Sequence, residues 1–95
     1  MYARVTRYKM KPDSIGAATA LMEELKPQIL GMPGMVRFIN AHDDTGAGYV
    51  VSIVESKEIS DAAQGAVQAM WSNFAAFLEG PPEPQGFTLI ADWSN

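Results

Sequence analysis

Residues 35–55 read MVRFINAHDDTGAGYVVSIVE, two strand-like arms on either side of a turn-like segment. Its two arms, residues 35–42 and 47–55, are rich in β-branched and aromatic side chains, as β-strands are. Between the arms, residues 43–46 read DDTG, four turn-forming residues with the glycine last. The spacing predicts a β-hairpin with a four-residue loop.

A strand and a helix are predicted before this hairpin. Residues 2–9, YARVTRYK, have the composition of a strand. From Ser14 the apolar residues recur every three or four positions, which predicts a helix that ends at Gly31. Pro27 lies inside this pattern, and its ring would clash with the carbonyl group four residues earlier. We therefore expect the helix to kink or restart near Pro27.

A second helix and a last strand are predicted after the hairpin. The helical segment starts at about Ser56, is broken near Gly65 and stops at Gly80, which two prolines follow. Residues 86–94, GFTLIADWS, are predicted to form the last strand.

The resulting element order, β-α-β-β-α-β, predicts an α+β fold of the ferredoxin-like, split βαβ type. In this fold a four-stranded antiparallel sheet carries both helices on one face. The chain has 95 residues, of which 47% are hydrophobic and 19% are charged, as expected for a single domain spanning residues 1–95.

The hairpin register predicts which side chains share a face. A four-residue loop places His42 opposite Ala47, and Asn40 opposite Tyr49. The other face then carries the apolar residues Ile39, Val50 and Val54. Because both faces are largely apolar, the face without helices needs a cover. We expect a homodimer through Ile39, Val50 and Val54, in which two sheets pair as a dimeric α/β barrel.

Charge and composition exclude several classes of protein. Seven Lys and Arg residues against eleven Asp and Glu give a net charge of −4, and the basic residues form no stripe that would bind nucleic acid. The chain has no cysteine, so it offers neither a thiolate nucleophile nor a cysteine-ligated metal. It lacks the pattern of a signal peptide and any apolar run of membrane-spanning length. We expect a cytoplasmic protein that binds neither nucleic acid nor membrane.

An aromatic stripe marks the candidate site. Residues 67–80 read VQAMWSNFAAFLEG, with apolar side chains on one helical face. We expect Trp71 and Phe74 to form one wall of a pocket that Asn40 and Tyr49 close from the opposite side. The remaining members of the stripe are expected to fill the core; they are Val67, Met70, Phe77 and Leu78. The alternative is that the whole stripe is core, because helical spacing alone explains it.

His42 is the only histidine and therefore the candidate general base near neutral pH. Its place beside the hairpin turn is equally typical of a solvated polar side chain. The sequence has no carboxylate pair, phosphate-binding glycine loop, metal-ligand spacing or serine nucleophile elbow. Hydrolase and phosphotransferase activities therefore have no visible machinery.

Four segments resemble the antibiotic biosynthesis monooxygenase family. They are MYARVTRYKMKP at the start, LKPQILGMPGM at the end of the first helix, the hairpin arm that ends in IVES before the second helix, and the closing strand. The resemblance implies a small homodimer with a pocket between helices and sheet. It also implies oxidation of polycyclic aromatic compounds by dioxygen, or haem degradation, generally without a flavin; many relatives have no known activity.

The residues implied by the resemblance differ between its branches. The haem-degrading branch uses an asparagine, a tryptophan and an iron-binding histidine, where this chain has Thr6, Trp71 and Pro81. This departure argues against haem, and we expect neither a cofactor nor a metal. The quinone-forming branch uses tryptophan, asparagine, tyrosine and arginine side chains. Residues of these types occur here as Trp71, Asn40, Tyr49 and Arg37.

Two functions stay open on the sequence alone. One is a cofactor-independent oxygenase of small phenolic or quinone-like compounds. The other is a non-catalytic dimeric barrel that binds an apolar small molecule or has no ligand. The two differ in whether a cavity lies between Trp71 and the hairpin.

Overall fold

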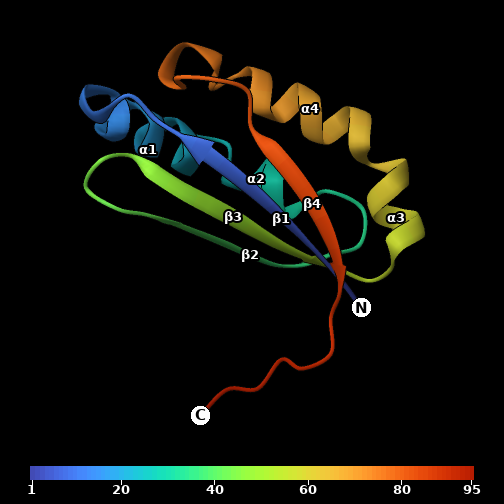
Figure 1. Cartoon of the computed structure of the whole chain (residues 1–95). Coiled ribbons are helices and arrows are strands. Elements are labelled where there is room, and N and C mark those ends of the chain that lie inside the picture. The colour runs from blue at the N-terminus through green and yellow to red at the C-terminus, as the bar shows by residue number, and fades with distance from the viewer.

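The computed structural model describes residues 1–95 and contains four strands that form one antiparallel sheet (Figure 1). The elements in chain order are β1 (Tyr2–Lys9), α1 (Ile15–Glu24), α2 (Lys26–Leu30), β2 (Met35–His42), β3 (Ala47–Val54), α3 (Lys57–Ala62), α4 (Gln64–Ser72) and β4 (Glu83–Thr88). Short 3-10 turns occur at Pro12–Ser14 and Ala75–Phe77.

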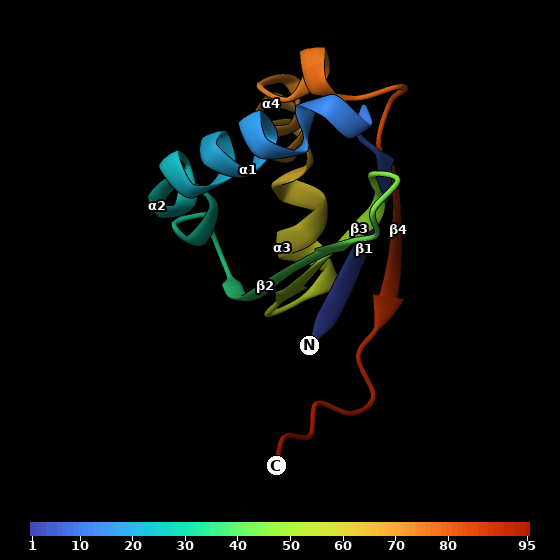
Figure 2. The ribbon, with the colours of Figure 1, turned by 90° about the vertical axis from the view of Figure 1, so that its left-hand side faces the viewer.

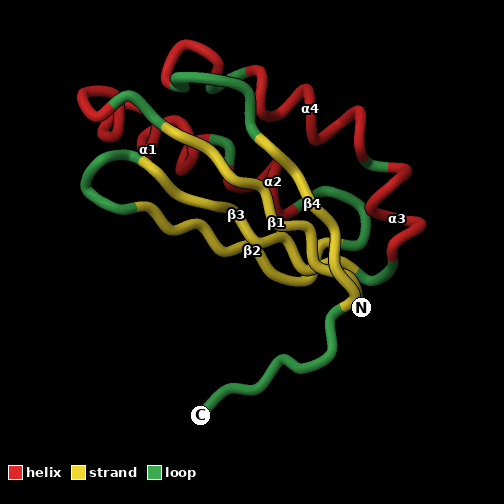
Figure 3. Tube along the Cα trace, viewed as in Figure 1, coloured by secondary structure: helices red, strands yellow, loops and turns green.

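The strand order is β2-β3-β1-β4, and all neighbouring strands are antiparallel. The helices all lie on one side of this sheet, which the side view in Figure 2 and the trace in Figure 3 show. The predicted ferredoxin-like arrangement is therefore confirmed. None of the helices has both the length and the apolar character needed to cross a bilayer.

Both helical segments are interrupted, close to the predicted positions. The first ends at Glu24, with Leu25 as its C-cap, and a new helix, α2, follows. Pro27 lies in the first turn of α2, where a backbone N–H would have no helical partner.

The second helical segment divides at Ala63, two residues before Gly65. Its second part, α4, ends at Ser72, so the predicted stop at Gly80 is wrong: only a short 3-10 turn follows, at Ala75–Phe77. Ser56 begins α3 as an N-cap, since its hydroxyl accepts a hydrogen bond from the Ile59 N–H at 3.1 Å.

The hairpin loop is one residue shorter than predicted. The Asp43 N–H donates to the Ala47 carbonyl at 2.9 Å, so only residues 44–46 lie outside the ladder. Gly46 has a φ of +90°, the left-handed conformation that ends this type of loop. Hydrogen bonds from the Thr45 hydroxyl and the Thr45 N–H lower the pKa of Asp43 and hold the turn together.

The shorter loop shifts the register, which corrects the predicted faces. Asn40 pairs with Val50, and Tyr49 pairs with Ala41. Because strand side chains alternate, a shift of one residue moves all of β3 to the other side of the sheet. Val50 and Val54 therefore lie on the helix side, whereas Ile39 lies on the open face. The predicted dimer surface of Ile39, Val50 and Val54 is wrong, because these residues do not share a face.

The last strand begins earlier than predicted, at Glu83 instead of Gly86. It pairs only with β1, so it is an edge strand in which Pro84 needs no second ladder partner. The strand also ends earlier than predicted, at Thr88 instead of Ser94, and Ile90 and Trp93 beyond it are 94% and 92% exposed.

Candidate functional site

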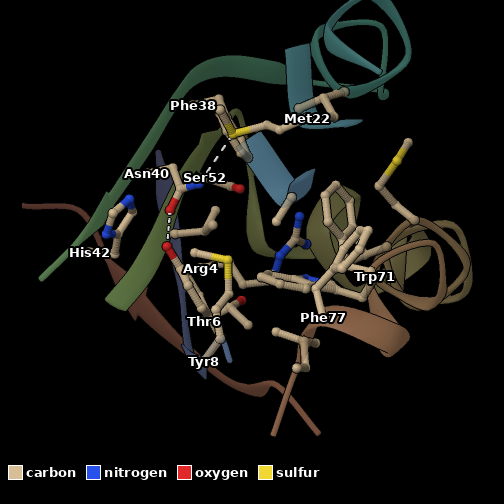
Figure 4. Close-up of a pocket in the computed structure, with 18 of the residues that line it drawn as sticks. Arg4, Thr6, Tyr8, Met22, Phe38, Asn40, His42, Ser52, Trp71 and Phe77 are labelled. Atoms are coloured by element: carbon tan, nitrogen blue, oxygen red, sulfur yellow. Dashed lines mark hydrogen bonds between the residues drawn. The ribbon is translucent and has the colours of Figure 1, made fainter. Parts of the chain in front are cut away.

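A cavity of about 200 Å³ lies between the sheet and the helices (Figure 4). Of the 21 residues that line it, 15 are hydrophobic. No large side chain in the chain is fully buried, although this layer is where a solid core would normally lie. The apolar faces of the sheet and the helices therefore enclose a cavity.

The helix side of the cavity is aromatic. The Trp71 ring lies 5.7 Å from the Tyr8 ring and 6.3 Å from the Phe74 ring, centroid to centroid. The lining also includes Val67, Met70, Phe77 and Leu78. These four residues were expected to fill the core, but they line the cavity together with Trp71 and Phe74. Helical spacing alone therefore does not distinguish core residues from cavity-lining residues.

The sheet side of the cavity carries a hydrogen-bonded polar pair. The Tyr8 hydroxyl donates to Asn40 Oδ1 at 2.5 Å, and Asn40 Nδ2 donates to Met22 Sδ at 3.2 Å. Burial raises the pKa of Tyr8, and the Asn40 hydrogen bond offsets this only in part, so the phenol is protonated at neutral pH. Figure 4 shows the pair across the cavity from Trp71 and Phe77. The Asn40 amide has one further N–H available to a ligand.

His42 also lines the cavity, at the side away from Trp71 (Figure 4). Its Nδ1 atom lies 2.9 Å from the Asp43 carbonyl oxygen, and the residue is exposed. The imidazole therefore lies at the solvent-exposed side of the cavity, away from the aromatic wall.

The structure brings four of the five predicted site residues to one cavity: Trp71, Phe74, Asn40 and His42. Tyr49 is the exception. It pairs with Ala41 and Arg7 on the open face and is 48% exposed, because the register differs by one residue from the prediction. Arg37 does not line the cavity and instead forms an ion pair with Asp92 at 2.8 Å.

Sequence reasoning missed the contribution of β1. Arg4, Thr6 and Tyr8 alternate along this strand and all line the cavity. The polar pair of the cavity is thus Asn40 with Tyr8, in place of the expected Asn40 with Tyr49. The alternation of polar residues in YARVTRYK is the signal that could have indicated it.

A second hollow, a groove of about 700 Å³, adjoins the cavity between α3, α4, β1 and β4. Only 5 of its 19 lining residues are hydrophobic. Five residues line both spaces: Arg4, Thr6, Val67, Trp71 and Leu78. The apolar cavity and the polar groove therefore share a wall.

The three positions that the resemblance links to haem degradation, Thr6, Trp71 and Pro81, all line the groove. Thr6 and Trp71 also line the cavity. No group of three or more histidine and acidic side chains comes together that could hold a metal ion.

Several solved structures have the same arrangement of strands and helices. A candidate antibiotic biosynthesis monooxygenase from Nitrosomonas europaea is 17% identical, with a TM-score of 0.75 over 96% of this chain and 100% of that chain. The corresponding protein from Caulobacter crescentus is 14% identical, with a TM-score of 0.77 over 95% and 90%. This chain has the fold of these proteins.

A protein of unknown function from Nitrosomonas europaea has the same fold, at 18% identity and a TM-score of 0.79 over 99% of this chain and 93% of that chain. No protein-family model matches the sequence, and no curated protein matches it. The resemblance to antibiotic biosynthesis monooxygenases is confirmed at the level of the fold.

Proposed function

We propose that this chain is an antibiotic biosynthesis monooxygenase-like protein that oxidises small phenolic or quinone-like compounds with dioxygen and without a cofactor. The observation that carries the proposal is the aromatic-lined cavity with the Tyr8–Asn40 pair on its wall. The fold shared with candidate monooxygenases supports it.

The size of the cavity favours small substrates. An apolar cavity of roughly 150 Å³ accommodates benzene, so the 200 Å³ here suits a compound of one or two rings. Trp71 and Phe74 offer flat faces for such rings, and the free Asn40 N–H can donate to a phenolic oxygen. The apolar lining keeps water from the reacting ring.

The proposed reaction balances without an external reductant. A phenol with a free para position and one O₂ give a quinone and one water. The substrate loses four electrons and two hydrogens; one oxygen atom becomes the new carbonyl oxygen and the other leaves in the water. The protein is required only to hold the ring, favour its phenolate form and exclude water.

The alternative function is a non-catalytic barrel that binds an apolar small molecule or has no ligand. The lining favours this binding function in one respect: the cavity offers little acid or base chemistry. His42, its only histidine, lies at the exposed side, and no carboxylate lines the cavity. A binding protein needs neither group.

Oxidation of 1-naphthol tests the proposal. We expect the purified, colourless protein to convert it to 1,4-naphthoquinone with one O₂ consumed per product, unchanged by a metal chelator. Haem titration should give no saturable axial-ligand spectrum. Oxygen uptake and quinone absorbance are the measurements. Binding without turnover would support the alternative function, and haem-dependent turnover lost in His42→Ala would contradict the absence of a cofactor.

We also propose that the chain forms a homodimer through the open face of the sheet. This face carries Ile39, Tyr49 and Val51, and the first two are 41% and 48% exposed. No helix covers it (Figure 2). A domain of 95 residues buries a limited share of its surface, so a second copy on this face would add apolar contact area.

Val51→Lys tests this surface. We expect the variant to yield monomers or aggregates, because a lysine charge in an apolar interface is strongly unfavourable. Ala20→Lys adds the same charge on the exposed side of α1 and should remain a dimer. Light scattering measures the mass of each. A Val51→Lys dimer as stable as the wild type would show that this face is free.

A further inference from the structure

Arg4 stands at the junction of the cavity and the groove. Its side chain projects from β1 toward the helices. Like Trp71 of α4, Arg4 lines both spaces. The cavity is mostly apolar and the groove mostly polar, so the guanidinium group marks the boundary between them. A ligand whose rings lie in the cavity would therefore contact Arg4 where the cavity opens into the groove.

The Arg4 side chain has no carboxylate partner. The three ion pairs of the structure join Lys9 to Glu79, Arg37 to Asp92 and Lys57 to Asp61. Its only hydrogen bond runs from Nη1 to the Ser60 hydroxyl at 3.0 Å. The guanidinium has five N–H donors, so most of them have no acceptor within the protein.

The two carboxylates that line the groove are already engaged. Asp61 and Glu79 line the groove, but each pairs with a lysine, at 2.9 Å and 2.7 Å. Burial lowers the pKa of Arg4, which reflects incomplete solvation of its charge, although an arginine stays protonated at neutral pH. A half-buried cation without a counter-charge is unfavourable. An anionic ligand group would relieve this cost.

We infer that Arg4 binds the carboxylate of an aromatic acid whose rings lie in the cavity against Trp71. The planar guanidinium matches a carboxylate in a two-point contact. A phosphate would bring more negative charge, yet Arg4 is the only lysine or arginine that lines either space, and two acidic residues line the groove. The site therefore suits a monoanion. This inference rests on the ligand cavity of the proposed function and defines its substrate class more narrowly.

A matched pair of ligands tests the inference: 5-hydroxy-2-naphthoate and its neutral amide, 5-hydroxy-2-naphthamide, both of which keep a free position para to the hydroxyl group. Calorimetric titration under argon separates binding from any oxidation. We expect the wild type to bind the acid about 10- to 100-fold more tightly than the amide. Arg4→Met should bring the two affinities within about twofold, mainly by weakening the acid, while Arg4→Lys should keep part of the preference.

Lys26→Met is the matched control, because Lys26 is an exposed cation on α2 that lines neither the cavity nor the groove. It should keep the full preference for the acid. Equal binding of acid and amide to the wild type, binding of neither, or an unchanged preference in Arg4→Met would each overturn the inference. If Arg4→Met fails to fold, the affinities of the wild type for the acid and for the amide still test the inference.

The same ligands separate this inference from the proposed oxygenase. If the acid binds through Arg4 but no phenolic compound is oxidised in air, the oxygenase proposal fails and the ligand class stands. If the amide is oxidised as efficiently as the acid, the oxygenase proposal gains support and the role of Arg4 is contradicted.

Discussion

Trp71→Ala is expected to abolish binding of planar phenolic compounds, with at least a 100-fold loss of affinity, at a small cost in stability. A core tryptophan cut to alanine costs about 3 to 5 kcal/mol. The Trp71 indole packs beside Tyr8 and Phe74 but faces the cavity on another side, so it has fewer contacts to lose. We expect its free energy of unfolding to fall by about 1 to 2 kcal/mol.

Val54→Ala is the matched core variant, because Val54 is 3% exposed and does not line the cavity. It should lower the free energy of unfolding by about 1.5 to 3 kcal/mol and leave ligand affinity unchanged. Urea denaturation and calorimetric titration with 1-naphthol give the two quantities. A large stability loss in Trp71→Ala, together with no binding to the wild type, would identify the stripe as plain core.

Gly46→Ala is expected to lower the free energy of unfolding by about 2 to 4 kcal/mol. Gly46 has a φ of +90°, and an added Cβ would collide with the carbonyl oxygen of Met10. The same residue accepts a hydrogen bond from the Met10 N–H at 2.8 Å, so the backbone cannot move away without losing that contact. The substitution therefore strains both the hairpin loop and its neighbour.

Gly65→Ala serves as the control for this effect. It lies in α4 with no atom near the position of a new Cβ, and alanine favours helix. We expect a gain of up to about 1 kcal/mol. Equal stabilities of Gly46→Ala and the wild type in urea denaturation would show that the loop does not require its left-handed glycine.

The order of elements was predictable because each is governed by local chemistry. Alternating and helical periods of apolar residues are visible in the sequence, and a proline such as Pro27 is tolerated only in the first turn of a helix, so it predicts a restart. Trp71 and Asn40 were predicted to share a pocket because each element had been assigned correctly. The structure brings both to one cavity.

The hairpin register was not predictable from composition, because DDTG suits loops of three or four residues equally well. The choice depends on Asp43 pairing with Ala47 and on the left-handed Gly46, both of which are tertiary outcomes. Because the loop is one residue shorter than predicted, Tyr49 lies outside the site and Val50 lines the cavity. The start of β4 was missed for a related reason, since Pro84 is tolerated only because the strand is at an edge.

The cavity itself has no sequence signature. Val67, Met70 and Phe77 have the spacing of a core stripe, and they line a cavity only because the opposite sheet face leaves space. The hydrogen bond between Tyr8 and Asn40 joins residues 32 positions apart, and no local pattern marks it.

We claim that the space between the sheet and the helices is a ligand site, and a crystal structure with bound 1-naphthol would show this. We predict that the rings lie in the cavity against Trp71, with the phenolic oxygen within hydrogen-bonding distance of the Tyr8–Asn40 pair. A structure in which Trp71, Phe74 and Phe77 close the cavity, with no naphthol bound there at saturating concentration, would contradict the claim.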